Sequence, residues 1–173
     1  MKSVIRSEFK KTINIHKLRS LLPDYVIVKK YDQLRGNSLK DIMGNKTVLV
    51  VLWNIHNRQH RVLNQPGHFW LISTRGPEKC VVFSSTGMTY KKELFLTQSD
   101  PSLLERVLPK GTIYNNVKLQ TSNDSNTCWR WMILYAHLAP MGLRSFQKLF
   151  HKPNIHINNS DNLCVLLTLM ALY

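Results

Sequence analysis

The chain has 173 residues, of which 43% are hydrophobic, and this length and composition suit one folded domain over residues 1–173. Its 24 Lys and Arg against 10 Asp and Glu give a formal net charge of +14, which favours a polyanionic partner. No apolar run reaches the roughly 18 residues of a membrane span, and the N-terminus lacks the apolar core of a signal peptide, so we expect no membrane partner and a reducing compartment.

Hydrophobic periodicity and turn residues predict the elements in chain order. They are a helix over 12–22 ended by Pro23, a strand over 25–28, a short helix over 38–43, a buried strand over 48–53, a hairpin of strands 67–73 and 79–83, helices over 90–96 and 102–108, a strand over 113–119, and helices over 128–138, 143–150 and 161–173. This order, with strands and helices in separate runs, predicts the α+β class.

Cys128 stands where a polar run ends and an apolar stretch begins. The run 120–127 supplies several residues that favour helix N-caps, and the stretch 129–138 is apolar enough for a buried helix. We therefore expect Cys128 in the first turn, where free backbone N–H groups and the helix dipole favour negative charge. That setting lowers the pKa of a thiol and allows a thiolate nucleophile. The alternative is a cysteine that only packs.

Two further residues are candidates for the same chemistry. His68 follows Pro66-Gly67 and opens a strand-like run, and strand ends commonly expose catalytic groups. It is the candidate base for Cys128, unless it is a half-buried structural histidine. Gln120 directly follows the predicted strand 113–119. Its amide is a candidate oxyanion donor, together with the Cys128 backbone N–H, unless it only bonds to its own loop.

These blocks together carry a resemblance to a known family. The blocks are His68-Phe-Trp70, the strand followed by Ser-Ser-Thr-Gly over 80–87, and Gln120 preceding Cys128 on an apolar helix. In order and spacing they resemble the adenain-like cysteine proteases, which are related to the SUMO-deconjugating proteases. Length and charge resemble in particular the capsid-maturation proteases of virophages (Sputnik-type) and polinton-like viruses. The match covers residues 48–138.

The resemblance implies a single papain-like (adenain-like) domain, with a small mixed sheet packed between helices and Cys128 at the N-terminus of a central buried helix. It implies a viral cysteine endopeptidase that cleaves capsid or virion precursor proteins near small residues, in the virion and the infected-cell cytoplasm (the viral factory). His68 would draw the proton from Cys128, and Gln120 would hold the oxyanion while a thioester forms and is hydrolysed. The chemistry requires no cofactor, although in this family a polyanion such as DNA can act as one.

The chain departs from the family pattern at the third catalytic position. The family has an acidic residue or Asn where Ser84 (or Ser85) stands here. A serine can accept from the imidazole N–H and fix its tautomer, but it brings no charge to stabilise an imidazolium. We therefore expect a dyad assisted by Ser84, or an acid recruited from elsewhere. Glu78 lies in the hairpin turn, too far away for this role.

Two more departures concern the surroundings of Cys128. Trp129 follows the cysteine, where the family commonly has Gly, and we expect it to reshape the substrate groove. The spacing from Gln120 to Cys128 is longer than usual, so Asn123 or Asn126 is an alternative amide donor.

Metal and nucleic-acid sites are the competing interpretations. His56 and His60 have the i, i+4 spacing of a zinc pair, but Asn57 stands where HExxH chemistry needs Glu, and the segment is rich in cations. Three cysteines without a CxxC pair predict neither a zinc knuckle nor a disulfide framework. The alternative to an enzyme is a basic virion protein that binds nucleic acid. Because the cations are spread along the chain, its DNA contacts would be diffuse, sequence-independent and sensitive to salt.

Overall fold

A computed structural model describes residues 2–34, 38–53, 68–97, 100–121, 126–150 and 160–172. The strands are β1 (Val26–Lys30), β2 (Val48–Trp53), β3 (His68–Ser73), β4 (Val81–Phe83) and β5 (Ile113–Tyr114). The α-helices are α1 (Lys2–Phe9), α2 (Ile15–Ser20), α3 (Leu39–Met43), α4 (Tyr90–Thr97), α5 (Ser102–Val107), α6 (Cys128–Leu138), α7 (Leu143–Phe150) and α8 (Ser160–Leu172). Short 3-10 turns cover Tyr31–Gln33 and Ala139–Met141. The α+β class predicted from the sequence is confirmed.

The five strands form one mixed sheet in the order β1-β2-β3-β4-β5. The pairs β1–β2 and β4–β5 are parallel, whereas β2–β3 and β3–β4 are antiparallel. The predicted hairpin is therefore present as β3 and β4. Its register pairs Leu71 with Phe83 and Ser73 with Val81.

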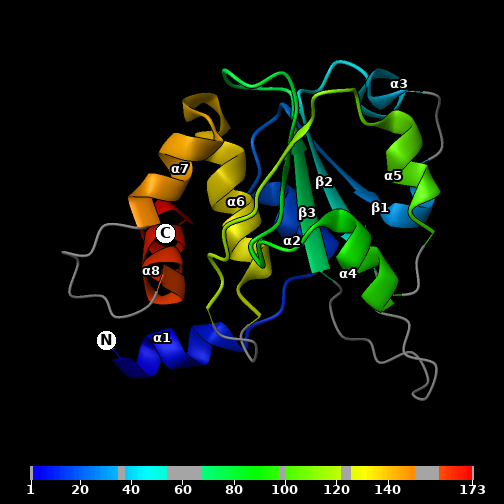
Figure 1. Ribbon diagram of the computed structural model, residues 1–173. Coiled ribbons are helices and arrows are strands. Elements are labelled where there is room, and N and C mark those ends of the chain that lie inside the picture. The colour runs from blue at the N-terminus through cyan, green and yellow to red at the C-terminus, as the bar shows by residue number, and fades with distance from the viewer. Residues whose placement is uncertain are drawn as a thin grey trace.

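Helices cover both faces of the sheet, as Figure 1 shows with α6, α7 and α8 on one side and α4 and α5 on the other. Side chains alternate between the faces along a strand. Thus Phe69 and Leu71 pack in the core on the α6 side, and Trp70 and Ile72 pack in the core on the α4 side. The strand β2 is a continuous apolar run because both of its faces are buried.

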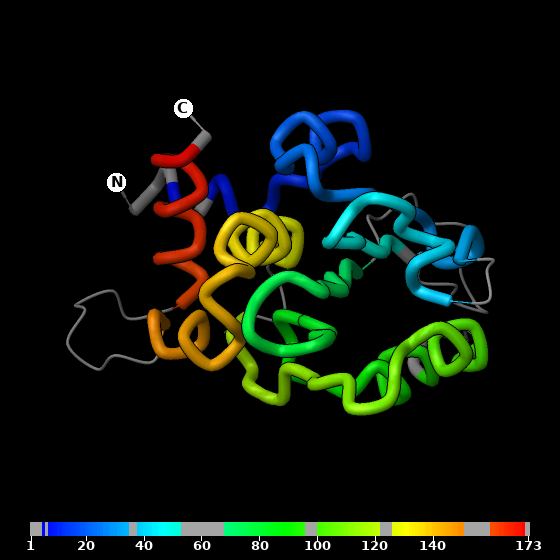
Figure 2. Tube along the Cα trace, turned by 90° about the horizontal axis from the view of Figure 1, so that it is seen from above, coloured from blue at the N-terminus to red at the C-terminus, as the bar shows by residue number. Residues whose placement is uncertain are grey.

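The N-terminal helix α1 is an element that the sequence pattern did not predict. It lies beside α8, so the first and last helices of the described chain are in contact (Figure 2). A buried ion pair between Glu8 of α1 and Arg130 of α6 holds it there. A helix of eight residues is too short to be stable on its propensity alone, which explains why local pattern gave little sign of it.

The strand predicted over 113–119 was wrong beyond Tyr114. The side chain of Asn115 accepts from the backbone N–H of Val117 at 3.0 Å, and its amide nitrogen donates to the Val117 carbonyl at 3.0 Å. Asn side chains that bond local backbone in this way compete with the strand ladder. The chain after β5 is therefore a loop, and it leads to Gln120.

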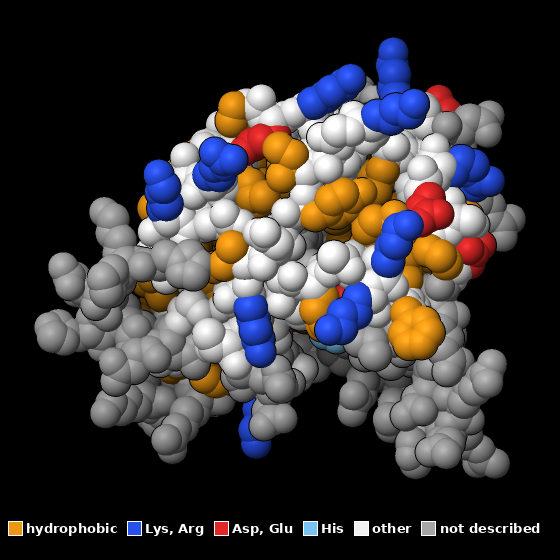
Figure 3. All heavy atoms as spheres, viewed as in Figure 1, with side chains coloured by type: hydrophobic (Ala, Val, Ile, Leu, Met, Phe, Trp, Pro, Cys, Tyr) orange, Lys and Arg blue, Asp and Glu red, His pale blue; other side chains and the backbone are white. Residues whose placement is uncertain are grey.

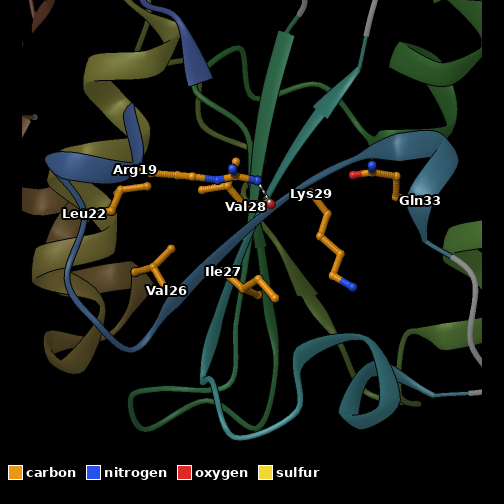
Figure 4. Close-up of a pocket in the computed structure, with 7 residues that line it drawn as sticks. All are labelled: Arg19, Leu22, Val26, Ile27, Val28, Lys29 and Gln33. Carbon is orange, nitrogen blue, oxygen red and sulfur yellow. Dashed lines mark hydrogen bonds between the residues drawn. The ribbon is translucent and has the colours of Figure 1, made fainter. Parts of the chain in front are cut away.

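β1 forms an edge of the sheet, and side chains occupy part of that edge. Arg19 of α2 donates to the Val28 carbonyl at 3.2 Å, and the Lys30 N–H donates to Gln33 Oε1 at 3.0 Å. Arg19, Val28 and Gln33 line an open groove of about 610 Å³ along β1 (Figure 4). Bonds of this kind reduce the tendency of an edge strand to pair with another chain.

The described helices include none long and apolar enough to cross a membrane. Lys and Arg side chains are scattered over the face seen in Figure 3 rather than gathered in one cluster. This distribution agrees with the spread of cations along the sequence.

Candidate active site

Cys128 is the first residue of α6, as the sequence predicts, and it is half-buried. The residue before it, Thr127, occupies the N-cap position but makes no side-chain cap bond. Its hydroxyl instead donates to Asp161 Oδ1 at 2.7 Å. The expected capping by the polar run is therefore replaced by a tertiary bond to α8.

The pKa of the Cys128 thiol is raised to about 12, so the expectation of a lowered pKa was wrong. Burial is the largest cause, because it removes water from the thiolate, and the negative charge of Glu93 adds to it. The backbone N–H groups of Trp129, Cys128 and Phe69 act in the opposite direction. The helix N-terminus does favour the thiolate, but desolvation outweighs it.

His68 is the first residue of β3 and is half-buried. The backbone N–H of the next residue, Phe69, lies near the Cys128 sulfur and acts to lower the pKa of the thiol. The thiol at the start of α6 therefore meets the start of β3, beside the predicted base. This contact is between residues 59 positions apart in the sequence, and only the packing of α6 on the sheet produces it.

Gln120 is buried and is held by Ser85. The Ser85 hydroxyl donates to Gln120 Oε1 at 2.9 Å, and the Ser85 carbonyl accepts from the backbone N–H groups of Leu119 and Gln120. The bond to Ser85 fixes the orientation of the Gln120 amide by engaging its oxygen, so the nitrogen is the amide's donor group.

Asp161 of α8 ties the Gln120 segment to the Cys128 segment. Its carboxylate is fully buried and accepts from the backbone N–H and hydroxyl of Thr121 on Oδ2, at 2.8 and 3.0 Å. Oδ1 accepts from Thr127 and from the Trp131 indole. One carboxylate thus bonds the residue after Gln120 and the residue before Cys128.

Ser84 lies at the end of β4 and is buried, but its hydroxyl bonds to an acid. It donates to Glu93 Oε1 at 2.7 Å. Glu93, on α4, also accepts from the Thr86 hydroxyl and from the Trp70 indole N–H. Glu78 of the hairpin turn is engaged elsewhere, since it accepts from the Leu143 N–H at the start of α7.

Glu93 is the functional candidate to which the family pattern does not point. It is only 4% exposed, so the carboxylate lies in the interior. Its signal in the sequence is helical spacing, because Tyr90, Glu93 and Leu94 fall on one face of α4. A carboxylate in line with apolar residues on a helix is uncommon enough to mark a buried acid.

The alternative amide donors and Trp129 have other contacts. Asn126 donates to the carbonyls of Phe9 and Lys10 through its backbone N–H and its amide nitrogen, at 2.7 and 3.2 Å. Its side chain therefore faces the segment after α1, which argues against an oxyanion role. Asn123 lies outside the described residues. The Trp129 indole donates to the Lys11 carbonyl at 3.0 Å, so Trp129 packs on this same N-terminal segment.

No group of three or more His, Cys, Asp or Glu side chains that could hold a metal ion occurs among the described residues. His56 and His60, the zinc pair weighed from the sequence, lie outside that part of the chain.

A second surface of interest is a pocket of about 500 Å³ between α3 and α5, which we call the α3–α5 pocket. Its apolar lining comes from Leu39, Met43, Val107, Leu108 and Pro109. Its cations are Lys40, Lys46, Lys79 and Arg106, and no acid is among its lining residues. Lys46 precedes β2 and Thr74, also in the lining, follows β3, so the pocket lies at the opposite end of the sheet from His68.

Comparisons with known proteins give a structural likeness and no family. No family model matches the sequence, and no curated protein matches it. Among solved structures, the chain is similar to the central domain of the uncharacterized protein Lpg1148 from Legionella pneumophila. That likeness has 15% sequence identity and a TM-score of 0.45, and covers 93% of this chain and 97% of the other.

Proposed function

We propose that this protein is an adenain-like viral cysteine endopeptidase that cleaves capsid or virion precursor proteins during particle maturation. The observation that carries the proposal is the interaction of the Phe69 backbone N–H with the Cys128 thiol, which brings the helix-start thiol to the end of β3 that begins with His68. Gln120, and Ser84 at the position where the family has an acid or Asn, are bonded into the same end of the sheet. The proposed site of action is the virion and the cytoplasmic viral factory.

The proposed reaction is acyl transfer through a thioester. His68 takes the Cys128 proton, the sulfur attacks the scissile carbonyl carbon, and Gln120 with the Cys128 N–H binds the resulting oxyanion. His68 then protonates the leaving amine, and a water molecule hydrolyses the thioester to release the acid. Because the thiol pKa is raised to about 12, a stable thiolate is disfavoured in the free protein. Proton transfer to His68 would then accompany attack on the substrate.

The test is co-expression with the capsid proteins of the same genome, comparing the wild type with Cys128→Ala and His68→Ala. We expect precursor cleavage only by the wild type. His16→Ala is the matched control, because His16 is exposed on α2, away from β3, and it should cleave normally. If the wild type leaves every precursor intact, or either site variant still cleaves, the proposal fails.

We propose DNA binding as a second property, and the α3–α5 pocket is the observation that favours it. Four cations without an acid in the lining make a locally positive surface, on a chain with a net charge of +14. Such a surface suits sequence-independent contact with phosphates. The same property would serve a polyanion-dependent protease or, in the alternative function, a non-enzymatic virion protein that binds nucleic acid.

A further inference from the structure

We propose that Glu93 supplies the negative charge that stabilises protonated His68, acting through the hydroxyl of Ser84. The inference rests on the proposed function, since it takes His68 as the base. In the family pattern an acid stands where this chain has Ser84. Here the acid reaches that position from α4, so Glu93 is a positioning residue for His68.

The Glu93 carboxylate is buried and is bonded by neutral hydrogen-bond donors. It is 4% exposed, and burial of a carboxylate is unfavourable unless hydrogen bonds replace its water. Ser84 and Thr86 donate to one oxygen and Trp70 to the other. These donors are neutral groups, so they hold the carboxylate without cancelling its charge.

The hydroxyl of Ser84 can pass this charge on. A carboxylate only accepts hydrogen bonds, so the hydrogen of Ser84 is directed at Glu93 and the serine oxygen remains an acceptor. Hydrogen bonds in a chain polarise one another, which makes that oxygen a stronger acceptor for an imidazole N–H. Thr86 has the same arrangement and lies 2.8 Å from Ser84, oxygen to oxygen.

Strand geometry puts His68 on the side of Glu93. Successive residues of a strand face opposite sides, so His68 shares the face of Trp70, whose indole bonds to Glu93. The helix α4 lies on that side of β3 (Figure 1). Among the described residues, the titratable groups near this end of the sheet include His68 on β3, Glu93 on α4 and Cys128 on α6, whose pKa Glu93 raises, and Tyr90 of α4 packs on Trp70.

The test is an NMR titration of the His68 ring in the wild type and in Glu93→Gln, which removes the charge at nearly constant shape. We expect the His68 pKa to fall by about one unit in the variant, because an imidazolium loses a nearby negative charge. Ser84→Ala keeps the charge but removes the bridging hydroxyl, and it should lower the pKa in the same direction. Ser84→Ala also tests the inference by itself if Glu93→Gln does not fold. Glu105→Gln, which changes an exposed acid on α5, should leave the pKa unchanged.

The inference is overturned if the His68 pKa is the same as in the wild type in whichever of Glu93→Gln and Ser84→Ala fold. This titration needs no substrate, so it separates the two proposals. A lowered pKa without any precursor cleavage by the wild type would remove the protease assignment and leave the role of Glu93. Cleavage by the wild type with an unchanged His68 pKa in the variants would keep the protease assignment and remove the role of Glu93.

Discussion

The hydroxyl of Thr127 donates to Asp161 Oδ1 at 2.7 Å, and this bond joins the residue before Cys128 to the first turn of α8. The same carboxylate accepts from Thr121, the residue after Gln120. The relative position of the proposed nucleophile and the proposed oxyanion donor therefore depends on a buried acid that belongs to neither segment.

Asp161→Asn is expected to destabilise the protein by about 3 kcal/mol. Its amide nitrogen would replace one of the two oxygens that now accept hydrogen bonds, and the donors bonded to that oxygen would lose their acceptor. We also expect faster alkylation of Cys128 by iodoacetamide in the folded variant, because Thr127 loses its anchor and the loosened helix start exposes a thiol whose pKa burial raises. Urea unfolding and alkylation followed by mass spectrometry measure the two effects. Asp32→Asn, at an exposed position, is the control and should change neither. Wild-type stability in Asp161→Asn would contradict the role given to this carboxylate.

Glu8→Gln should destabilise the fold by about 3–5 kcal/mol, because it removes the carboxylate that balances the charge of the buried Arg130. Glu8 and Arg130 are 7% and 2% exposed. The double variant Glu8→Leu/Arg130→Met should recover much of this loss. The control is Glu105→Gln, whose ion pair with Lys91 is exposed, and we expect a change of less than about 1 kcal/mol there. If urea unfolding gives the same loss of stability for Glu8→Gln and Glu105→Gln, the buried pair does not hold α1 in place.

Stability is expected to fall as the pH rises above about 9. Burial raises the pKa of Tyr31 to about 12 and also raises that of Tyr135, as it does for Cys128. A group whose pKa is higher in the folded state stabilises that state below its unfolded pKa, and this contribution is lost as the pH rises towards the folded value. Thermal unfolding followed by circular dichroism between pH 7 and 11 measures the loss.

Tyr135→Phe tests the origin of this alkaline sensitivity. Within the described residues the buried Tyr135 hydroxyl has no hydrogen-bond partner, so its removal should raise stability at pH 7 by about 1 kcal/mol. The fall in Tm at high pH should also become shallower. A Tm that stays level to pH 11 in the wild type, or a variant with an equally steep fall, would refute the assignment to buried hydroxyls.

DNA affinity should depend on the α3–α5 pocket. For a random-sequence duplex in fluorescence anisotropy, the triple variant Lys40→Ala/Lys79→Ala/Arg106→Ala should reduce the slope of log affinity against log salt by about 2–3, at roughly 0.9 per phosphate contact. The charge-matched control changes Lys10, Lys17 and Lys148 to Ala; these lysines are exposed and do not line the pocket. A wild-type affinity insensitive to salt would exclude this binding mode, and equal losses in the two triple variants would exclude the pocket as its centre.

The helices and strands were largely predictable because their signals are local. The apolar run 48–53, the turn between the hairpin strands and the start of α6 at Cys128 follow from residue pattern alone. The strand predicted over 113–119 was too long. The side chain of Asn115 bonds to the backbone of its own loop, and β5 therefore ends at Tyr114. α1 was missed because it is stabilised by the ion pair between Glu8 and Arg130, and Arg130 lies far from α1 in the sequence.

The sequence by itself determined the α+β class, the place of Cys128 in the first turn of its helix and the place of His68 at the start of its strand. Each depends on neighbours within a few residues. Only the tertiary structure decided the pKa of Cys128, since burial outweighs the helix N-terminus. It alone also brought Glu93 to Ser84 and joined Thr121 to Thr127 through Asp161. Desolvation and hydrogen bonds between distant segments depend on how the helices pack on the sheet, and no local pattern of residues encodes that packing.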